Sequence, residues 1–85
     1  MKLNTDKQAL SLALLPVNAK AIVLSITEND PMLRQKLLDM GLISGTSVKL
    51  VNTAPLNDPV NLELRGYQLC IRKHEIKNVL VKVIS

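Results

Sequence analysis

Residues 30–51 constrain the fold of this chain more than any other part, because they predict a helix, two sharp turns and a strand in immediate succession. Asp30 can accept a hydrogen bond from the free backbone amides at a helix start, and Pro31 suits the first helical position. Apolar side chains recur at helical spacing through the next two turns, at Leu33, Leu37 and Met40. Polar side chains cover the opposite face, which indicates an amphipathic helix.

Two glycines separate this helix from the strand that follows it. Gly41 can adopt the left-handed conformation that ends a helix, and Leu42 then stands where a Schellman cap places an apolar contact with Leu37. Gly45 offers a second bend, and residues 46–52 then alternate as a strand. This helix–turn–strand corner is the most specific local pattern in the sequence.

Short segments rich in branched aliphatic side chains account for most of the remaining chain. They predict strands at residues 20–27, 60–64, 67–71 and 79–84. In the first of these segments, strict alternation places Ala21, Val23 and Ser25 on one face. Residues 9–15 fit either a short strand or a helical turn, with Ser11 as a cap.

These elements together predict a mainly β fold. The expected architecture is a small SH3-like barrel of about five strands, with one helix inserted after the first barrel strand. Residues 72–76 supply a short helical turn before the last strand. Residues 65–66, Arg-Gly, predict the tight turn of a hairpin between the third and fourth barrel strands.

The composition predicts one small domain in a reducing compartment. We expect a single domain spanning residues 1–85, with residues 1–8 as a flexible tail. The single cysteine, Cys70, cannot form an internal disulfide, which favours the cytoplasm. Residues 2–15 imitate a signal peptide, but an acidic residue lies among the flanking charges and Pro16 interrupts the end, so secretion is the weaker interpretation. No apolar run is long enough to cross a membrane, and we expect no direct insertion.

The net charge of +4 is spread along the chain. Only Arg72, Lys73 and Lys77 cluster, so a mildly basic solvated surface is the simplest interpretation. The alternative is an electrostatic footprint for an acidic partner or nucleic acid. The lone aromatic residue, Tyr67, cannot form a stacking platform for single strands or an aromatic groove for proline-rich peptides. We therefore expect no nucleic acid partner.

Catalytic and metal-binding chemistry has little support in the sequence. None of the seven acidic residues forms an evident pair with a nucleophile, so we expect no enzyme activity and no cofactor. Cys70 and His74 are weak candidates for metal ligands, since two ligands are too few for a structural zinc site. A site shared between two chains of a dimer is the alternative. The competing interpretations are a small buried hydrophobe for Cys70 and a partly exposed surface side chain for His74.

A stiff loop before the third barrel strand is the best candidate for a binding surface. Residues 54–59 contain two prolines, Pro55 and Pro59, and Leu56 is the only large apolar side chain among them. Contact with a partner protein is expected from five consecutive residues, Ala54, Pro55, Leu56, Asn57 and Asp58. Leu42 is a further candidate, although its place in a helix cap favours burial. The alternative for Leu56 is that it folds back onto the barrel.

Several segments of the chain, taken together, resemble the ferrous iron transport protein A family (FeoA). They are, in order, residues 37–42 (Leu-Leu-Asp-Met-Gly-Leu) with Gly45 and Val48, the alanine–proline loop at 54–59, and residues 66–72 with Glu75. Leu15-Pro16 before the first strand also fits the family. The resemblance covers residues 11–83, and its specificity lies in the order and spacing of the segments. Asn18, Ser44 and Asn57 depart from it, because the family often has Gly, Pro and Gly there. Asn tolerates a left-handed backbone, so two of these changes are mild.

The resemblance implies a small cytosolic SH3-like protein that works with the bacterial ferrous iron transporter. That transporter is a membrane protein with a cytosolic GTP-binding domain, and the implied role is accessory or regulatory binding at the inner face of the membrane. Some members of the family are linked to transition-metal binding, for which this sequence offers no convincing ligand set.

A second interpretation is a regulatory SH3-like domain related to the tails of iron-dependent repressors. Such a domain would bind protein, metal or DNA. The sequence lacks the winged-helix segment of those repressors, which counts against direct DNA binding.

Overall fold

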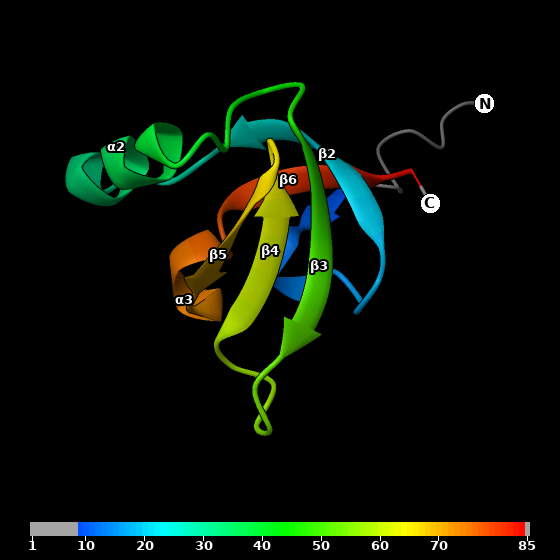
Figure 1. The fold of residues 1–85 in the computed structure, drawn as a ribbon. Helices are drawn as coiled ribbons and strands as arrows, with labels where there is room; N and C mark the ends of the chain where they lie inside the picture. The colour runs from blue at the N-terminus through cyan, green and yellow to red at the C-terminus, as the bar shows by residue number, and fades with distance from the viewer. Residues whose placement is uncertain (1–8, 85) are drawn as a thin grey trace.

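The fold is a strongly curved antiparallel sheet with two small helices at one side (Figure 1). The structure is a computed structural model, and it describes residues 9–84. The expected tail at residues 1–8 lies outside the described residues. Six strands form the sheet in the order β1-β6-β2-β3-β4-β5. Their bounds are Ala9–Ser11, Lys20–Ile26, Ser47–Thr53, Val60–Leu64, Tyr67–Ile71 and Val79–Val83 for β1 to β6.

The mainly β prediction is confirmed, and the strand count is corrected from about five to six. The additional strand is β1, which pairs with β6 through Ala9↔Lys82 and Ser11↔Leu80. Residues 9–15 adopt both of the predicted forms, because the 3-10 helix η1 (Leu12–Leu14) follows β1 directly. The Ser11 hydroxyl caps η1 by accepting a hydrogen bond from the amide of Ala13 at 3.1 Å. The sheet is not closed, since β1 and β5 are its two ends.

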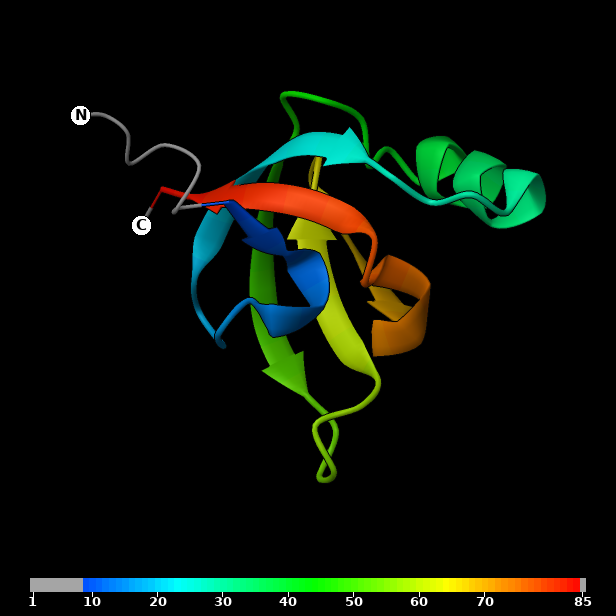
Figure 2. The ribbon, with the colours of Figure 1, turned by 180° about the vertical axis from the view of Figure 1, so that it is seen from behind.

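The core fills the concave side of the sheet and consists of aliphatic side chains. Figure 2 shows η1 and β1 on the side of the sheet opposite to β3 and β4. The fully buried large side chains come from the four inner strands, from η1 and α3, and from α2 with the turn after it: Leu12, Leu37, Leu42, Leu50, Leu62, Leu64, Ile76, Val23, Val48, Val60, Val79 and Val81. Alternate side chains of β3, β4 and β6 thus face the core, and Ile71 of β5 is also buried against it.

The alternation predicted for residues 20–27 fails in the second half of the strand. Ala21 and Val23 are buried as expected, but the register with β6 shifts between Val23 and Ser25. A bulge at this point places two residues opposite one and reverses which side chains face the core. Ser25 is exposed as a result, and Ile26 packs against the core instead.

Helix α2 (Pro31–Asp39) begins and ends as the sequence predicts. Its first amide is capped by Asp30, whose carboxylate accepts a hydrogen bond from Met32 at 3.0 Å. At the other end the amides of Gly41 and Leu42 donate to the carbonyls of Leu38 and Leu37 at 2.9 and 3.1 Å. These two bonds form a Schellman motif, and the φ of Gly41 is +99°.

The connection from β4 to α3 also follows the sequence pattern. Arg65 and Gly66 both have positive φ, at 52° and 85°, which is the conformation of the two-residue hairpin turn with the correct twist. Helix α3 is a single turn, Lys73–Ile76, as predicted. The carboxylate of Glu75 accepts a hydrogen bond from the amide of Arg72 at 3.3 Å and helps to start that turn.

Candidate partner-binding surface

The β3–β4 loop is held in one shape by its own backbone. The amide of Asn57 donates to the carbonyl of Ala54 at 2.8 Å, which closes a β-turn over Pro55 and Leu56. Asn57 itself has a φ of 67°, the left-handed conformation predicted for an Asn that replaces Gly. The amide of Ala54 then donates to the carbonyl of Pro59 at 3.0 Å and closes the base of the loop.

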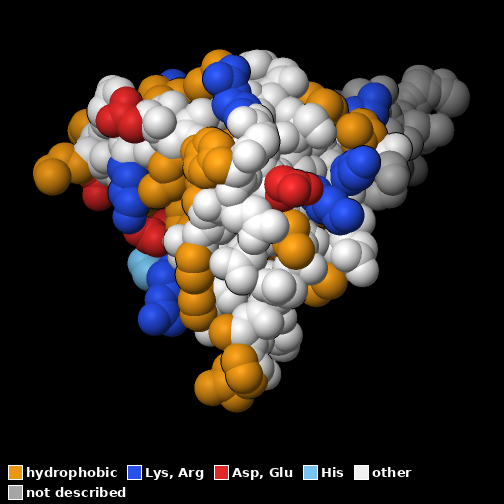
Figure 3. Space-filling view, in the orientation of Figure 1, with side chains coloured by type: hydrophobic (Ala, Val, Ile, Leu, Met, Phe, Trp, Pro, Cys, Tyr) orange, Lys and Arg blue, Asp and Glu red, His pale blue; other side chains and the backbone are white. Residues whose placement is uncertain are grey.

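Leu56 projects from the tip of this loop into solvent. Its side chain is 89% exposed, so the alternative in which Leu56 folds back onto the sheet is wrong. Figure 3 shows hydrophobic side chains gathered at the tip of the β3–β4 loop, with the basic and histidine side chains of the α3 region beside it. A large apolar side chain held in water on a stiff turn is the feature expected of a contact residue.

Ala54 is half-buried, unlike the three residues that follow it. Asp58 also differs from those three residues. It is half-buried, and its carboxylate accepts a hydrogen bond from the amide of Lys73 at 2.9 Å. Since that amide lies at the start of α3, Asp58 fixes the loop to the helix. We therefore assign Asp58 to positioning of the loop, while Pro55, Leu56 and Asn57 form its exposed tip.

Leu42 is fully buried and cannot touch a partner in this structure. Its burial follows from the Schellman cap, which turns the side chain of Leu42 back onto the core. The neighbouring Ile43 is 39% exposed instead. The candidate surface therefore keeps the loop and excludes Leu42.

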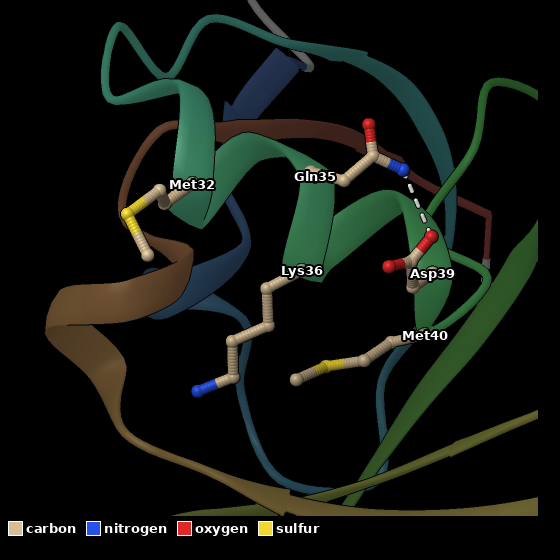
Figure 4. Close-up of a pocket in the computed structure, with 5 residues that line it drawn as sticks. All are labelled: Met32, Gln35, Lys36, Asp39 and Met40. Carbon is tan, nitrogen blue, oxygen red and sulfur yellow. Dashed lines mark hydrogen bonds between the residues drawn. The ribbon is translucent and has the colours of Figure 1, made fainter.

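A groove on α2 is a concave feature that the sequence did not predict. It has a volume of about 490 Å³ and is lined by Met32, Gln35, Lys36, Asp39 and Met40. Figure 4 shows Met32, Lys36 and Met40 extending toward the side on which α3 lies, while Gln35 and Asp39 hydrogen-bond to each other. Met32 is 83% exposed. The sequence does contain a sign of this groove, because Met32 is an apolar residue that lies just outside the apolar stripe that begins at Leu33.

One ion pair connects α2 to α3. The ammonium group of Lys36 lies 2.6 Å from the carboxylate of Glu75. This hydrogen bond from Lys36 is the main reason that the pKa of Glu75 lies below its ordinary value. The pKa of Glu28 is also lowered, chiefly by a hydrogen bond from the amide of Asp30.

The two weak metal-ligand candidates are both on the surface. Cys70 is exposed on β5, so its interpretation as a buried hydrophobe is wrong, and His74 is exposed on α3 as expected. Within residues 9–84 there is no group of three or more His, Cys, Asp or Glu side chains that could hold a metal ion. The structure thus adds no third ligand to Cys70 and His74. No helix among the described residues is long and apolar enough to span a membrane.

Comparison with known proteins decides the family. The FeoA domain model matches residues 10–83. The chain belongs to the FeoA domain family. Among solved structures, the FeoA-like protein of Clostridium acetobutylicum is 36% identical, with a TM-score of 0.83, and the match covers 92% of this chain and 90% of that one.

Two further structures share the fold of this FeoA domain. Stenotrophomonas maltophilia FeoA, crystallised with zinc and described as an SH3 domain protein, is 24% identical with a TM-score of 0.75, covering 86% of this chain and 89% of that one. The predicted SH3-like fold is thereby confirmed. The IdeR protein of T. acidophilum is 20% identical with a TM-score of 0.78, and the match covers 89% of this chain but 34% of that one.

One relative joins a FeoA region to a transporter. It is the Fe(2+) transport protein A/Fe(2+) transporter FeoB fusion protein of Porphyromonas gingivalis, 29% identical over 66 residues. The match covers 78% of this chain and 8% of the fusion protein, so the chain corresponds to a small part of that relative.

Proposed function

We propose that this FeoA domain is an accessory module of ferrous iron transport that acts by binding the transporter FeoB. The observation that carries the proposal is the fusion protein of P. gingivalis, in which the two names belong to one polypeptide. Joining two modules in one chain raises the effective concentration of each for the other to the millimolar range for short linkers. Such a fusion is advantageous when the two modules act in contact.

The contact surface in this proposal is the tip of the β3–β4 loop. Leu56 supplies an exposed apolar anchor, and the turn across Pro55 supplies a backbone that loses little freedom on binding. Asp58 contributes through the bond to Lys73 that holds the loop in place. Burial of one leucine side chain is worth about 1.5–3 kcal/mol, which corresponds to roughly a 10- to 100-fold change in Kd.

The test compares two exposed leucines. Binding of the full chain to FeoB of the same organism in lipid nanodiscs would be measured with the wild type, Leu56→Ser and Leu14→Ser. Leu14 is 71% exposed on η1 and serves as the matched control. We expect Leu56→Ser to raise Kd by about tenfold or more, and Leu14→Ser to leave it unchanged. Equal binding by all three chains would move the contact away from the loop, and the absence of binding by the wild type would overturn the proposal.

The module in this proposal is not an enzyme and works at the cytoplasmic face of the membrane. The absence of enzyme activity is supported by four carboxylates that already serve the fold. Each accepts a hydrogen bond from a backbone amide or a lysine: Glu28, Asp30, Asp58 and Glu75. We expect the chain alone to hydrolyse no GTP. Nucleotide turnover by the purified chain that survives further purification would contradict this part.

The second candidate function is a regulatory domain like the one in iron-dependent repressors. The fold likeness to IdeR favours it, but at 20% identity this likeness concerns the fold alone. Binding to DNA that weakens steeply as salt rises would support this function over the first. We expect no such binding.

A further inference from the structure

The outer edge of β5 carries backbone groups with no strand beside them. β5 is an end strand of the sheet and pairs with β4 alone. Leu64 and Tyr67 flank the two-residue turn, so their amides and carbonyls hydrogen-bond to each other. In an antiparallel ladder every second pair does the same, so Leu69 and Ile71 of β5 also bond to β4. The amides and carbonyls of the residues between them, Gln68 and Cys70, must therefore point away from β4.

These four groups have no other partner in the part of the chain that the structure describes. Outside the β4–β5 ladder, no backbone or side-chain hydrogen bond involves the amide or carbonyl of Gln68 or Cys70. Both residues are also exposed. Regularly spaced donors and acceptors at a sheet edge are the chemical requirement for addition of another strand.

This edge lacks three of the features by which proteins usually block such additions. Tyr67–Ile71 contains no charged residue and no proline, and no register shift interrupts its pairing with β4. The opposite end of the sheet differs, because β1 has three residues and leads directly into η1. Short edge strands are poor templates for pairing. The open edge of β5 is therefore a distinct feature of this sheet.

The surroundings of β5 indicate what kind of strand would fit. In Figures 1 and 2, α2 and α3 both lie on the side of the sheet where β5 ends it. The phenol group of Tyr67 donates a hydrogen bond to the carbonyl of Met40, which joins β5 to the end of α2. The side chains of Met32 and Met40 line the groove on α2. Arg65 and Arg72 are both exposed; Arg65 precedes β5 by two residues, and Arg72 follows it directly.

The charges argue against a second copy of this chain at that edge. An antiparallel pair of two β5 strands would bring Arg65 of one copy toward Arg72 of the other at both ends. Like charges placed opposite each other across two strands are destabilising. A segment with acidic residues flanking an apolar centre has the complementary charge and would meet the methionine side chains of α2.

We propose that β5 receives an extended segment of FeoB as an additional strand, with apolar residues at its centre and acidic residues near Arg65 and Arg72. This inference rests on the proposed function. The main-chain groups of Gln68 and Cys70 supply up to four hydrogen bonds to the incoming strand, while the loop tip at Leu56 makes a separate contact. The two contacts lie on one side of the molecule, because Val60 at the base of the loop pairs with Ile71 at the end of β5.

Hydrogen exchange of the backbone amides tests the proposal without any substitution. The full chain would be exposed to deuterated buffer, free and with full-length FeoB of the same organism in nanodiscs, and the β5 amides read by mass spectrometry with fragmentation. In the free chain, the amides of Gln68 and Cys70 should exchange rapidly, whereas those of Tyr67, Leu69 and Ile71 are held by β4. In the complex, we expect the exchange of Gln68 and Cys70 to slow by about tenfold or more.

A matched pair of variants provides the second arm. Gln68→Pro removes only an outward amide, which an edge strand tolerates, and Gln68→Thr keeps that amide. We expect Gln68→Pro to weaken binding by about tenfold and Gln68→Thr to change it less than about twofold. A complex that forms without added protection of Gln68 and Cys70 overturns the strand addition and leaves the proposed function standing. Absence of any complex overturns both.

Discussion

Backbone conformation at single residues determines where this chain can turn. Asn18, Asn57 and Arg65 have φ values of 74°, 67° and 52°, and each lies where one strand or turn gives way to the next. Asn is one of the few side chains that enters the left-handed region at low cost. This explains how Asn18 and Asn57 can adopt this conformation without being glycine. Gly41, at +99°, lies further from the conformations that a side chain tolerates.

Replacement of Gly41 by alanine should destabilise the domain by about 1–2 kcal/mol. Alanine would be strained at this positive φ, and its Cβ would lie 3.1 Å from Cδ of Arg65. The control is Gly45→Ala, where φ is +93° but nothing lies within 4 Å. Urea unfolding should show similar losses for both variants, because Arg65 can move aside. A stable Gly41→Ala would mean that the Schellman cap contributes little.

The two helices are joined to the sheet and to each other by a few polar links. Arg34 donates to the carbonyl of Ile26 at 2.7 Å, Tyr67 donates to the carbonyl of Met40, and Lys36 pairs with Glu75. Only Leu37 is fully buried among the residues of α2. The position of α2 relative to α3 therefore depends on polar contacts as well as on packing.

The link between Lys36 and Glu75 should make stability depend on pH. The pKa of Glu75 is lowered in the folded state, so its contribution is present above the ordinary glutamate value and lost as pH falls through the lowered pKa. Lys36 is half exposed, so the contribution should stay below about 1 kcal/mol. Unfolding by urea at pH 7 and at pH 3 should show that Glu75→Gln lowers stability at pH 7 and has a smaller effect at pH 3.

A double-mutant cycle isolates that pair from the other hydrogen bond of Glu75. Lys36→Met, Glu75→Gln and the double variant would be compared with the wild type at both pH values. The coupling energy should be favourable at pH 7 and should decrease toward pH 3. A coupling that is independent of pH would contradict the role given to the Glu75 carboxylate.

At the scale of the whole molecule, local sequence patterns predicted most helices, strands and turns, but not how these elements pair and pack in space. The cap at Asp30, the stop at Gly41 and the turn at Arg65-Gly66 depend on neighbouring residues, so the sequence is enough to find them. The bulge in β2 depends on pairing with β6, more than 50 residues away in the chain, and local alternation therefore missed it. The open edge of β5 and the groove on α2 likewise follow from the order of strands and the packing of α2.

Leu42 and Leu56 also show that the sequence alone does not tell which side chains are buried, and they provide the last prediction. Both were candidates for contact with a partner, yet one is fully buried and the other is 89% exposed. Leu42→Ala should cost about 2–5 kcal/mol, a large fraction of the stability of a domain of this size. Leu56→Ala should change the free energy of unfolding by less than about 0.5 kcal/mol, because it leaves no cavity.

Thermal unfolding followed by circular dichroism distinguishes the two leucines. We expect Leu42→Ala to melt far below the wild type or to be unfolded at room temperature, while Leu56→Ala melts with the wild type. Leu42→Met, which nearly conserves side-chain volume, is the matched control and should cost less than about 1.5 kcal/mol. A large loss of stability in Leu56→Ala would place that side chain in the core. The loop would then be a structural element, and the contact with FeoB would have to lie along β5 alone.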